Sequence, residues 1–200
     1  MPLEFKFIRI GNQEWMTRNL DVDQFRNGDL IPHAESNEAW KKAGENSQPA
    51  WCYYDNDPEN GKKYGKLYNW YAVNDIRGLA PKGFHVPTDE EWTILETFLG
   101  GDDFADHKMK SVEGWVDWED EDGELQNGNG DNSSGFNVLP GGYRNDDGSF
   151  FSIRFIAFFW SATESVSSYA WSRSLISNNG FVFRYLDDKR NGFSVRCLKD

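Results

Sequence analysis

Residues 88–101 read Thr-Asp-Glu-Glu-Trp-Thr-Ile-Leu-Glu-Thr-Phe-Leu-Gly-Gly and contain the clearest structural signal in the chain. Thr88 and Glu91 form a capping-box pattern, in which the threonine hydroxyl accepts a hydrogen bond from the Glu91 amide and the glutamate reaches back. The apolar residues that follow recur at helical spacing: Trp92, Leu95 and Leu99. Two glycines then provide a helix end. The stretch predicts an amphipathic helix over 88–99.

The sequence before this helix predicts a hairpin and two further helices. Residues 5–10 and 13–16 (Phe-Lys-Phe-Ile-Arg-Ile and Gln-Glu-Trp-Met) are separated by Gly11-Asn12, which is a two-residue turn signal. Ser36 is a capping residue for a short helix that Gly44 would stop. Aromatic and leucine residues between 64 and 75 recur at helical spacing, which predicts an amphipathic helix there.

The sequence after residue 101 changes first to loop and then to strand character. Residues 111–143 contain no lysine or arginine, eight acidic residues and several glycines, which is typical of a long loop region. From residue 150 onward, bulky apolar residues alternate with smaller or polar ones in four segments: 150–160, 169–175, 180–186 and 192–198. This alternation, with turn residues between the segments, predicts an antiparallel meander.

These elements together predict a single α+β domain over residues 1–200. The two main helices, 64–75 and 88–99, would pack on one twisted antiparallel sheet with long irregular loops around it. The sheet would be built from the N-terminal hairpin and the C-terminal strands. Six large apolar residues are expected in the core: Trp70, Trp92, Leu95, Phe159, Phe193 and Val195.

The charge balance limits the partners of this domain. The chain carries 33 acidic against 21 basic residues, a formal net charge of -12. Nucleic acids and anionic membrane surfaces attract basic proteins, so neither is an expected partner. No window is apolar enough to insert into a membrane, and the chain as given does not begin with a signal-peptide pattern. Export by another route, for example as part of a phage-like particle, is therefore kept as an alternative.

Two cysteines, Cys52 and Cys197, are too few for a disulfide scaffold and are not arranged as a CxxC motif. Two interpretations stay open. Either both are buried thiols, or a single disulfide joins the first half of the chain to its last segment.

Six phrases of the sequence, taken in order, resemble one known family. They are residues 15–20 (Trp-Met-Thr-Arg-Asn-Leu), 64–72 (Tyr-Gly-Lys-Leu-Tyr-Asn-Trp-Tyr-Ala), 81–92 (Pro-Lys-Gly-Phe-His-Val-Pro-Thr-Asp-Glu-Glu-Trp), 139–144 (Leu-Pro-Gly-Gly-Tyr-Arg), 159–164 (Phe-Trp-Ser-Ala-Thr-Glu) and 192–197 (Gly-Phe-Ser-Val-Arg-Cys). From about residue 8 to the C-terminus, the chain resembles the Fibrobacter succinogenes major paralogous domain.

The resemblance implies a C-type lectin-like fold in the wide sense. That superfamily also contains the formylglycine-generating, or sulfatase-modifying, enzymes and the variable receptor-binding proteins of diversity-generating retroelements. Members of the family occur mostly on secreted or surface-anchored bacterial proteins, which implies an extracellular or cell-surface location. A fold alone does not assign a function, so function must be argued from sites.

The residues argue against catalysis. Formylglycine-generating enzymes hold copper with two nearby cysteines, whereas Cys52 and Cys197 lie far apart in the sequence and only one is in the C-terminal segment. His85 precedes a helix, but no nucleophile motif accompanies it. We therefore expect no catalytic residue and no enzymatic activity, and a divergent oxidase is disfavoured.

Acidic residues gather in one loop: Asp117, Glu119, Asp120, Glu121, Asp122 and Glu124. Carboxylate oxygens suit Ca²⁺, but the EF-hand pattern is absent, as are the Glu-Pro-Asn and Trp-Asn-Asp phrases of calcium-dependent sugar-binding lectins. The favoured interpretation is a solvated acidic loop, with no metal or cofactor expected. Calcium binding stays an open alternative.

The C-terminal strands are the predicted binding surface. Tryptophan, tyrosine and arginine, the residues enriched in binding hot spots, alternate there with small residues. The expected ligand-binding residues are Trp171, Arg173, Asn178, Asn179, Arg184, Tyr185, Asp188 and Arg190. In the retroelement-diversified proteins that this fold resembles, the corresponding region binds the ligand.

The sequence therefore predicts a non-catalytic recognition module that binds a protein or glycan through the C-terminal strands and turns. The alternative is a structural or decorating subunit of a larger assembly, such as a phage-like fibre or contractile injection apparatus.

Overall fold

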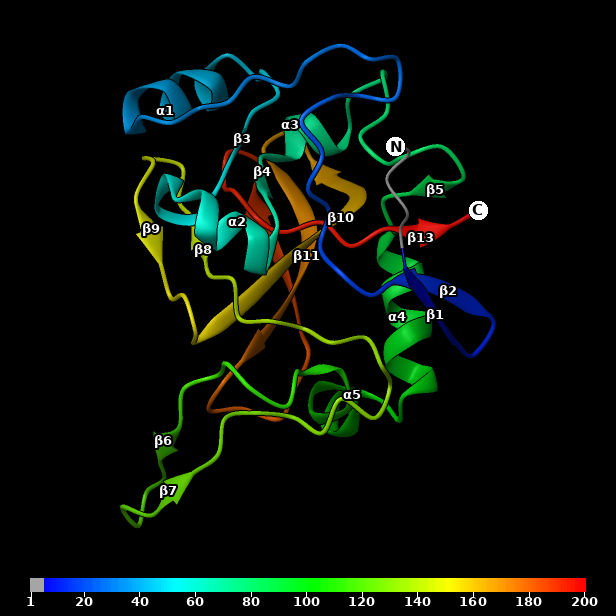
Figure 1. The fold of residues 1–200 in the computed structure, drawn as a ribbon, viewed down its shortest axis with the longest axis vertical. Coiled ribbons are helices and arrows are strands. Elements are labelled where there is room, and N and C mark those ends of the chain that lie inside the picture. Colours follow the sequence, from blue (N-terminus) through cyan, green and yellow to red (C-terminus); the bar gives the residue numbers. More distant parts are fainter. Residues whose placement is uncertain (1–5) are drawn as a thin grey trace.

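The computed structural model describes residues 6–200, in which helices and short strands are mixed up to Met109 and only strands follow (Figure 1). The predicted start of the first strand at Phe5 lies outside these residues. The helices are α1 (Asn37–Glu45), a 3₁₀ turn (Tyr54–Asn56), α2 (Pro58–Tyr64), α3 (Trp70–Val73), α4 (Asp89–Phe98) and α5 (Asp102–Met109). The strands are β1 (Phe7–Ile10), β2 (Gln13–Met16), β3 (Trp51–Cys52), β4 (Leu67–Tyr68), β5 (Phe84–His85), β6 (Trp118–Glu119), β7 (Leu125–Gln126), β8 (Tyr143–Arg144), β9 (Phe150–Phe151), β10 (Ile156–Val166), β11 (Tyr169–Ile176), β12 (Phe183–Asp188) and β13 (Leu198–Lys199). The mixed α+β character predicted from the sequence is confirmed.

A four-stranded sheet joins the two ends of the chain in the order β1-β2-β13-β5. The predicted hairpin is confirmed, with Ile10 opposite Gln13 and a turn at Gly11-Asn12. Gly11 has a φ of 61°, a conformation that glycine adopts without strain. Leu198 pairs with both Trp15 and His85, so the N-terminal hairpin lies beside the C-terminal strand as expected.

A second, three-stranded antiparallel sheet has the order β10-β11-β12. The predicted meander is thus confirmed for three strands, but the expectation of a fourth strand over 192–198 is wrong. Residues 192–197 form only isolated bridges, among them Tyr68 with Phe193 and Phe159 with Ser194, before β13 joins the other sheet. The predicted single sheet is therefore two sheets, because this last segment is buried between them rather than along an edge.

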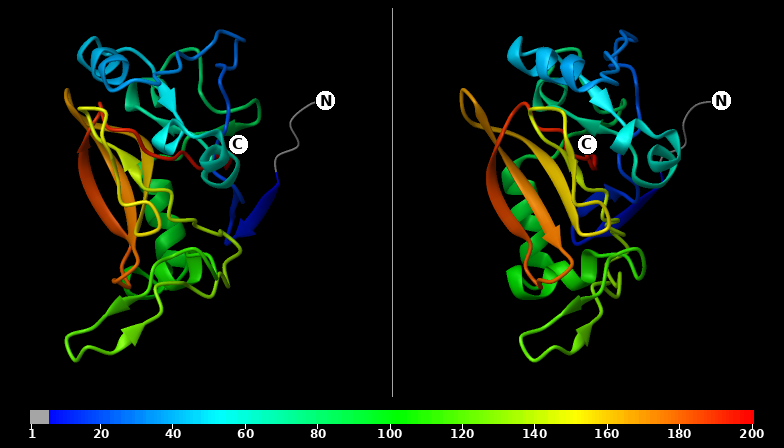
Figure 2. Two further views of the ribbon diagram at one scale, coloured as in Figure 1. Left: turned by 60° about the vertical axis from the view of Figure 1, so that its left-hand side comes forward. Right: turned by 90° about the vertical axis from the view of Figure 1, so that its left-hand side faces the viewer.

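Helix α4 confirms the prediction from the capping box. The Thr88 hydroxyl accepts from the Glu91 amide at 3.2 Å, and the Glu91 carboxylate accepts from the Thr88 amide at 2.8 Å. The buried face of α4 packs against β10 and β11 (Figure 2). All six residues predicted for the core are buried: Trp70, Trp92, Leu95, Phe159, Phe193 and Val195.

The predicted helix over 64–75 is wrong. Gly65 has a φ of 77°, and a Cβ at this position would lie 2.9 Å from the carbonyl oxygen of Leu20. The chain therefore ends α2 at Tyr64, forms the two residues of β4 and begins α3 after Asn69, whose side chain accepts from the Ala72 amide. The apolar residues at helical spacing are core residues on either side of this break.

The predicted loop region 111–143 is mostly irregular and contains one small hairpin, β6–β7, which projects from the body of the molecule (Figures 1 and 2). Within residues 6–200, no helix has both the length and the apolar character required to cross a membrane.

One ionic cluster fastens the C-terminal strand to α4 and makes stability depend on pH. His85 contacts Asp200 through Nδ1 at 2.9 Å and Glu91 through Nε2 at 3.0 Å. Burial alone would lower the pKa of His85, but hydrogen bonds to Asp200 and Glu91 outweigh it, so the pKa is raised. The protonated imidazole is therefore favoured in the folded state.

Because the folded pKa lies above the unfolded one, His85 stabilises the fold fully below its unfolded pKa of about 6.5. This contribution is lost as pH rises through the folded pKa. We expect His85→Gln to lower the free energy of unfolding more at pH 6 than at pH 8.5, by under about 1 kcal/mol because the cluster is partly exposed. Urea denaturation of both proteins at both pH values measures this, and an equal loss at both would contradict it.

Candidate functional site

The predicted ligand-binding residues occupy three separate places in the structure. Trp171, Arg173, Arg184 and Tyr185 are on β11 and β12, and Asn178 and Asn179 are in the turn between these strands. Asp188 ends β12, and Arg190 follows it. The sheet register separates the first group further, because Trp171 and Arg184 face α4 whereas Tyr185 faces the opposite side.

The predicted exposure of Arg173 is wrong. We expected an exposed contact residue, but its side chain is fully buried. Its guanidinium donates to Glu96 at 2.5 Å and to Asp89 at 2.7 Å, both on α4. The alternation along β11 was predicted correctly, but the face with large residues is the one that α4 covers.

Trp171 and Arg184 form a stacked pair at the open edge of that face. The guanidinium carbon of Arg184 lies 3.2 Å from the centre of a Trp171 ring, and the same group binds Asp89 at 2.8 Å. Beyond β12, Asp188 and Arg190 also bind each other, at 2.6 Å, and Arg190 binds Asp146 at 2.9 Å. Because these charged groups already bind partners within the protein, they would contribute less to the affinity for a ligand.

Asn178 and Asn179 border a hollow of about 410 Å³, which we call the amide hollow. Three segments line it: Asp106, His107 and Lys110 of α5; Trp118, Asn127, Gly128 and Asn129 of the long loop; and Ser177, Asn178, Asn179, Gly180 and Phe181 of the β11–β12 turn. Figure 1 shows α5, the β6–β7 hairpin and this turn at the same end of the molecule.

Two buried oxygens in the lining of the amide hollow have no hydrogen-bond partner among the described residues: Asp106 Oδ1 and Ser177 Oγ. The other oxygen of Asp106 binds Lys110 at 2.8 Å, and Lys110 also donates to the carbonyls of Ile176 and Asn179. Burial raises the pKa of Asp106 to about 6, although Lys110 opposes the shift. Neither oxygen has appreciable accessible surface, so both lie beneath the surface of the lining and a ligand in the hollow does not touch them.

The rest of the lining is neutral and partly aromatic. Asn127, Asn178 and Asn179 provide amide groups, and Trp118 and the exposed Phe181 provide ring surfaces at the border. Amides and aromatic rings together suit a ligand with many hydroxyl groups and apolar C–H faces.

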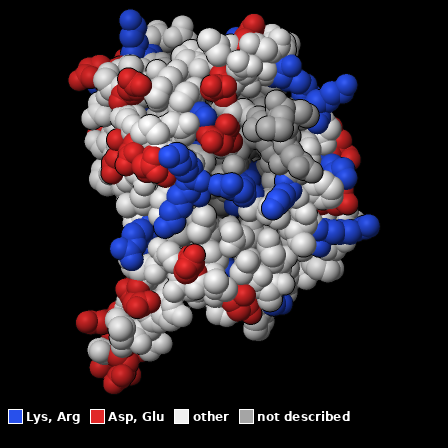
Figure 3. Space-filling view, viewed as in Figure 1, with Lys and Arg blue, Asp and Glu red and all other residues white. Residues whose placement is uncertain are grey.

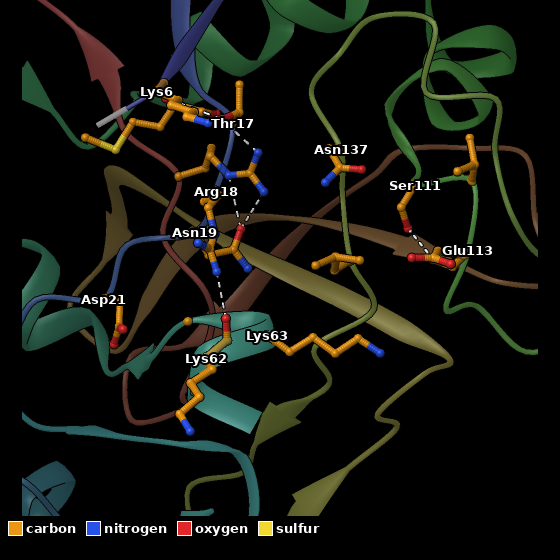
Figure 4. A pocket seen from close by; sticks show the side chains of 16 residues that line it. Lys6, Thr17, Arg18, Asn19, Asp21, Lys62, Lys63, Ser111, Glu113 and Asn137 are labelled. Atoms are coloured by element: carbon orange, nitrogen blue, oxygen red, sulfur yellow. Dashed lines mark hydrogen bonds between the residues drawn. The ribbon is translucent and has the colours of Figure 1, made fainter. Parts of the chain in front are cut away.

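A larger hollow of about 870 Å³ lies on another face and has a different chemistry. Its lining residues include five that carry positive charge: Lys6, Arg18, Lys62, Lys63 and Arg196. We call it the basic hollow. In Figure 3, lysine and arginine side chains gather near the middle of this face, and Figure 4 shows the side chains around the opening.

A family model, the Fibrobacter succinogenes major domain, matches residues 8–199. The chain belongs to this family. The family resemblance predicted from the sequence is therefore confirmed, and the match covers β1 to β13 except Phe7, including the residues of both hollows except Lys6. Neither the curated proteins nor the solved structures compared with the chain gave a match.

Most residues of the two hollows in this Fibrobacter succinogenes major domain were missed by the sequence analysis. Asp106 and Lys110 carried the only usable signal, because opposite charges four residues apart on a helix predict an ion pair. The sequence contained no comparable signal for Trp118, Ser177 or Arg196, because each hollow is formed by segments that are far apart in the sequence.

The cysteines and the acidic loop do not contribute to either hollow. Cys52 and Cys197 are both free and fully buried, and burial raises the pKa of each thiol to about 12, so both are protonated at neutral pH. In the acidic loop, Asp120 accepts from the amides of Asp122 and Glu124, as in a turn. Among the described side chains, no group of three or more histidine, cysteine or acidic residues is placed to hold a metal. Calcium binding stays an untested alternative.

Proposed function

We propose that this domain is a non-catalytic recognition module that binds a carbohydrate in the amide hollow. The observation that carries this proposal is the open hollow itself, which is lined by the amides of Asn127, Asn178 and Asn179 and by the rings of Trp118 and Phe181. Each amide can accept from one sugar hydroxyl through its oxygen and donate to another through its NH₂ group.

Two further features support a sugar over a charged ligand. Lys110 binds Asp106 at 2.8 Å, so this buried pair adds no net charge to the lining. Trp118 and Phe181 stand at the border, where rings can stack on the C–H face of a pyranose. The proposed site keeps Asn178 and Asn179 of the predicted set and adds residues from α5 and the long loop.

The proposal includes a C-type lectin-like architecture and a setting on the cell surface or on an exported particle. Three observations support this architecture. They are the six family phrases in order, the pairing of β2 with β13, and the packing of α4 beside the C-terminal strands. An experimental structure compared with members of that superfamily tests the architecture.

Glycan-array screening followed by titration calorimetry tests the function. We expect Trp118→Ala to weaken binding of the selected glycan by about 30-fold, since a stacking ring contributes about 2 kcal/mol. Asn178→Ala should weaken it less. Phe151→Ala removes an exposed ring outside the hollow and should leave the affinity unchanged.

The Trp171→Ala variant tests whether the glycan binds in the amide hollow or on the strand surface predicted from the sequence. Unchanged glycan affinity in this variant is the expected result. Loss of binding with Trp171→Ala and not with Trp118→Ala would move the site to the Trp171–Arg184 pair. Failure of every glycan to bind would contradict the carbohydrate proposal.

A further inference from the structure

The charge of the basic hollow is opposite to that of the protein. The chain has a formal net charge of -12, yet this lining contains five basic side chains and two acidic ones, Asp21 and Glu113. Asp21 is bound by Lys66 at 2.5 Å, so its charge is already neutralised. Acidic side chains instead crowd the projecting β6–β7 hairpin in Figure 3. Because like charges repel, a concentration of cations in one hollow raises the free energy of the empty site.

Arg196 is the most informative of the five. It is 1 % exposed, and its guanidinium donates only to neutral oxygens, those of Asn19, Met16 and Phe136. Among the side chains that the structure describes, no carboxylate forms an ion pair with it. Burial lowers the pKa of Arg196 to about 9, so the group still carries its charge at neutral pH. A buried cation without a counter-charge attracts anions strongly, since the protein interior screens it little.

The other cations surround the opening from separate segments. Lys6 precedes β1, Arg18 follows β2, and Lys62 and Lys63 end α2. Figure 4 shows Arg18 directed to the backbone of Lys62, to which it donates at 2.7 Å, while the two lysine side chains extend in different directions. One small ion cannot contact all of these groups, and the volume of about 870 Å³ is that of a site for an organic ligand.

We propose that the basic hollow binds a small organic polyanion with at least two carboxylate, sulfate or phosphate groups. One anionic group lies toward Arg196 and Arg18, and a second is held by Lys6 and Lys63 at the border, because Lys62 already binds Glu59 at 2.5 Å. Met16, Val112 and Leu139 in the lining contact the apolar part of the ligand. This site is independent of the proposed sugar site, because the two hollows share no lining residue.

Titration calorimetry of the full chain at low ionic strength tests the proposal. The probes are citrate, tripolyphosphate and sucrose octasulfate, which distinguish the three anionic groups, with maltotriose as the neutral control. We expect at least one anionic probe to bind with one-to-one stoichiometry and with an affinity that falls as sodium chloride is added. The binding signal of maltotriose should be the same in the wild-type protein and in the Lys6→Gln/Lys63→Gln variant.

Two double variants with equal loss of charge decide whether the hollow is the site. Lys6→Gln/Lys63→Gln removes two cations from the border, and we expect about tenfold weaker binding of the anionic probe. Lys41→Gln/Lys82→Gln removes two exposed lysines elsewhere and should change the affinity by less than about twofold. Thermal unfolding of each variant reports whether the fold is intact.

Equal weakening in both variants would show that net charge alone attracts the anion, and it would overturn the proposal. So would the failure of every anionic probe to bind the wild-type protein. Glycan affinity in Lys6→Gln/Lys63→Gln should stay at the wild-type value, so failure here is distinguishable from failure of the sugar site.

Discussion

Trp92→Ala is expected to lower the free energy of unfolding by about 4 kcal/mol, in the range found for removing a large buried aromatic side chain. Trp92 is the centre of an aromatic cluster in which its ring lies 4.9 Å from Trp15, 5.5 Å from Phe159 and 5.9 Å from Phe136. The indole is fully buried. The cluster joins α4, the N-terminal hairpin and β10, so a cavity there removes contacts from three elements at once. Urea denaturation followed by fluorescence and circular dichroism measures the loss.

Trp92→Phe is the matched control. The indole nitrogen of Trp92 is buried and has no hydrogen-bond partner among the described residues. Phenylalanine keeps most of the aromatic contact and removes this unsatisfied donor, so its smaller volume is partly offset. We expect a loss of under about 1.5 kcal/mol. If Trp92→Phe destabilised the protein as much as Trp92→Ala, the packing of the cluster would not be the cause.

The success with α4 and the failure over 64–75 have the same physical origin. Both stretches have apolar residues at helical spacing, but only one has agreeing signals at its two ends, a capping box at Thr88 and glycines after Leu99. In the other, Gly65 and Asn69 sit inside the apolar pattern, and each was a signal against a continuous helix. Helical spacing alone shows which residues are buried, whereas end signals show whether they belong to one helix.

The candidate sites show where sequence reasoning stops. Asn178 and Asn179 were predicted because turn residues between strands lie at the surface. Asp106 and Ser177 could not be paired with them, since the sequence does not show that α5 packs beside the β11–β12 turn. The basic hollow was even less predictable from the sequence, because an overall charge of -12 argues against anionic ligands. Only the fold shows that cations from four segments meet at one place.

Arg173→Met is expected to lower the free energy of unfolding by about 3–5 kcal/mol, because it removes one partner of a buried ion-pair network. The guanidinium of Arg173 has no exposed surface and binds both Glu96 and Asp89. Burial would raise the pKa of Asp89, but hydrogen bonds from Arg184 and Arg173 outweigh it and lower the pKa. Without Arg173, two carboxylates on α4 lose a buried cation beside β11. The double variant Arg173→Met/Glu96→Gln removes one of these charges and should recover part of the loss.

Arg184→Met provides the comparison, because Arg184 binds the same carboxylate from a different environment. Its guanidinium lies 2.8 Å from Asp89 Oδ2, as close as Arg173 lies to Oδ1, but its side chain is 44 % exposed. Solvent screens this pair and hydrates Asp89 when the partner is removed, so we expect a loss of under about 1 kcal/mol. Urea denaturation of the two single variants at neutral pH measures both losses. Equal losses would mean that burial does not distinguish the two arginines. The expected difference would show that β11 and α4 are held together by Arg173, and that Arg184 is free to exchange Asp89 for another partner at little cost to the fold.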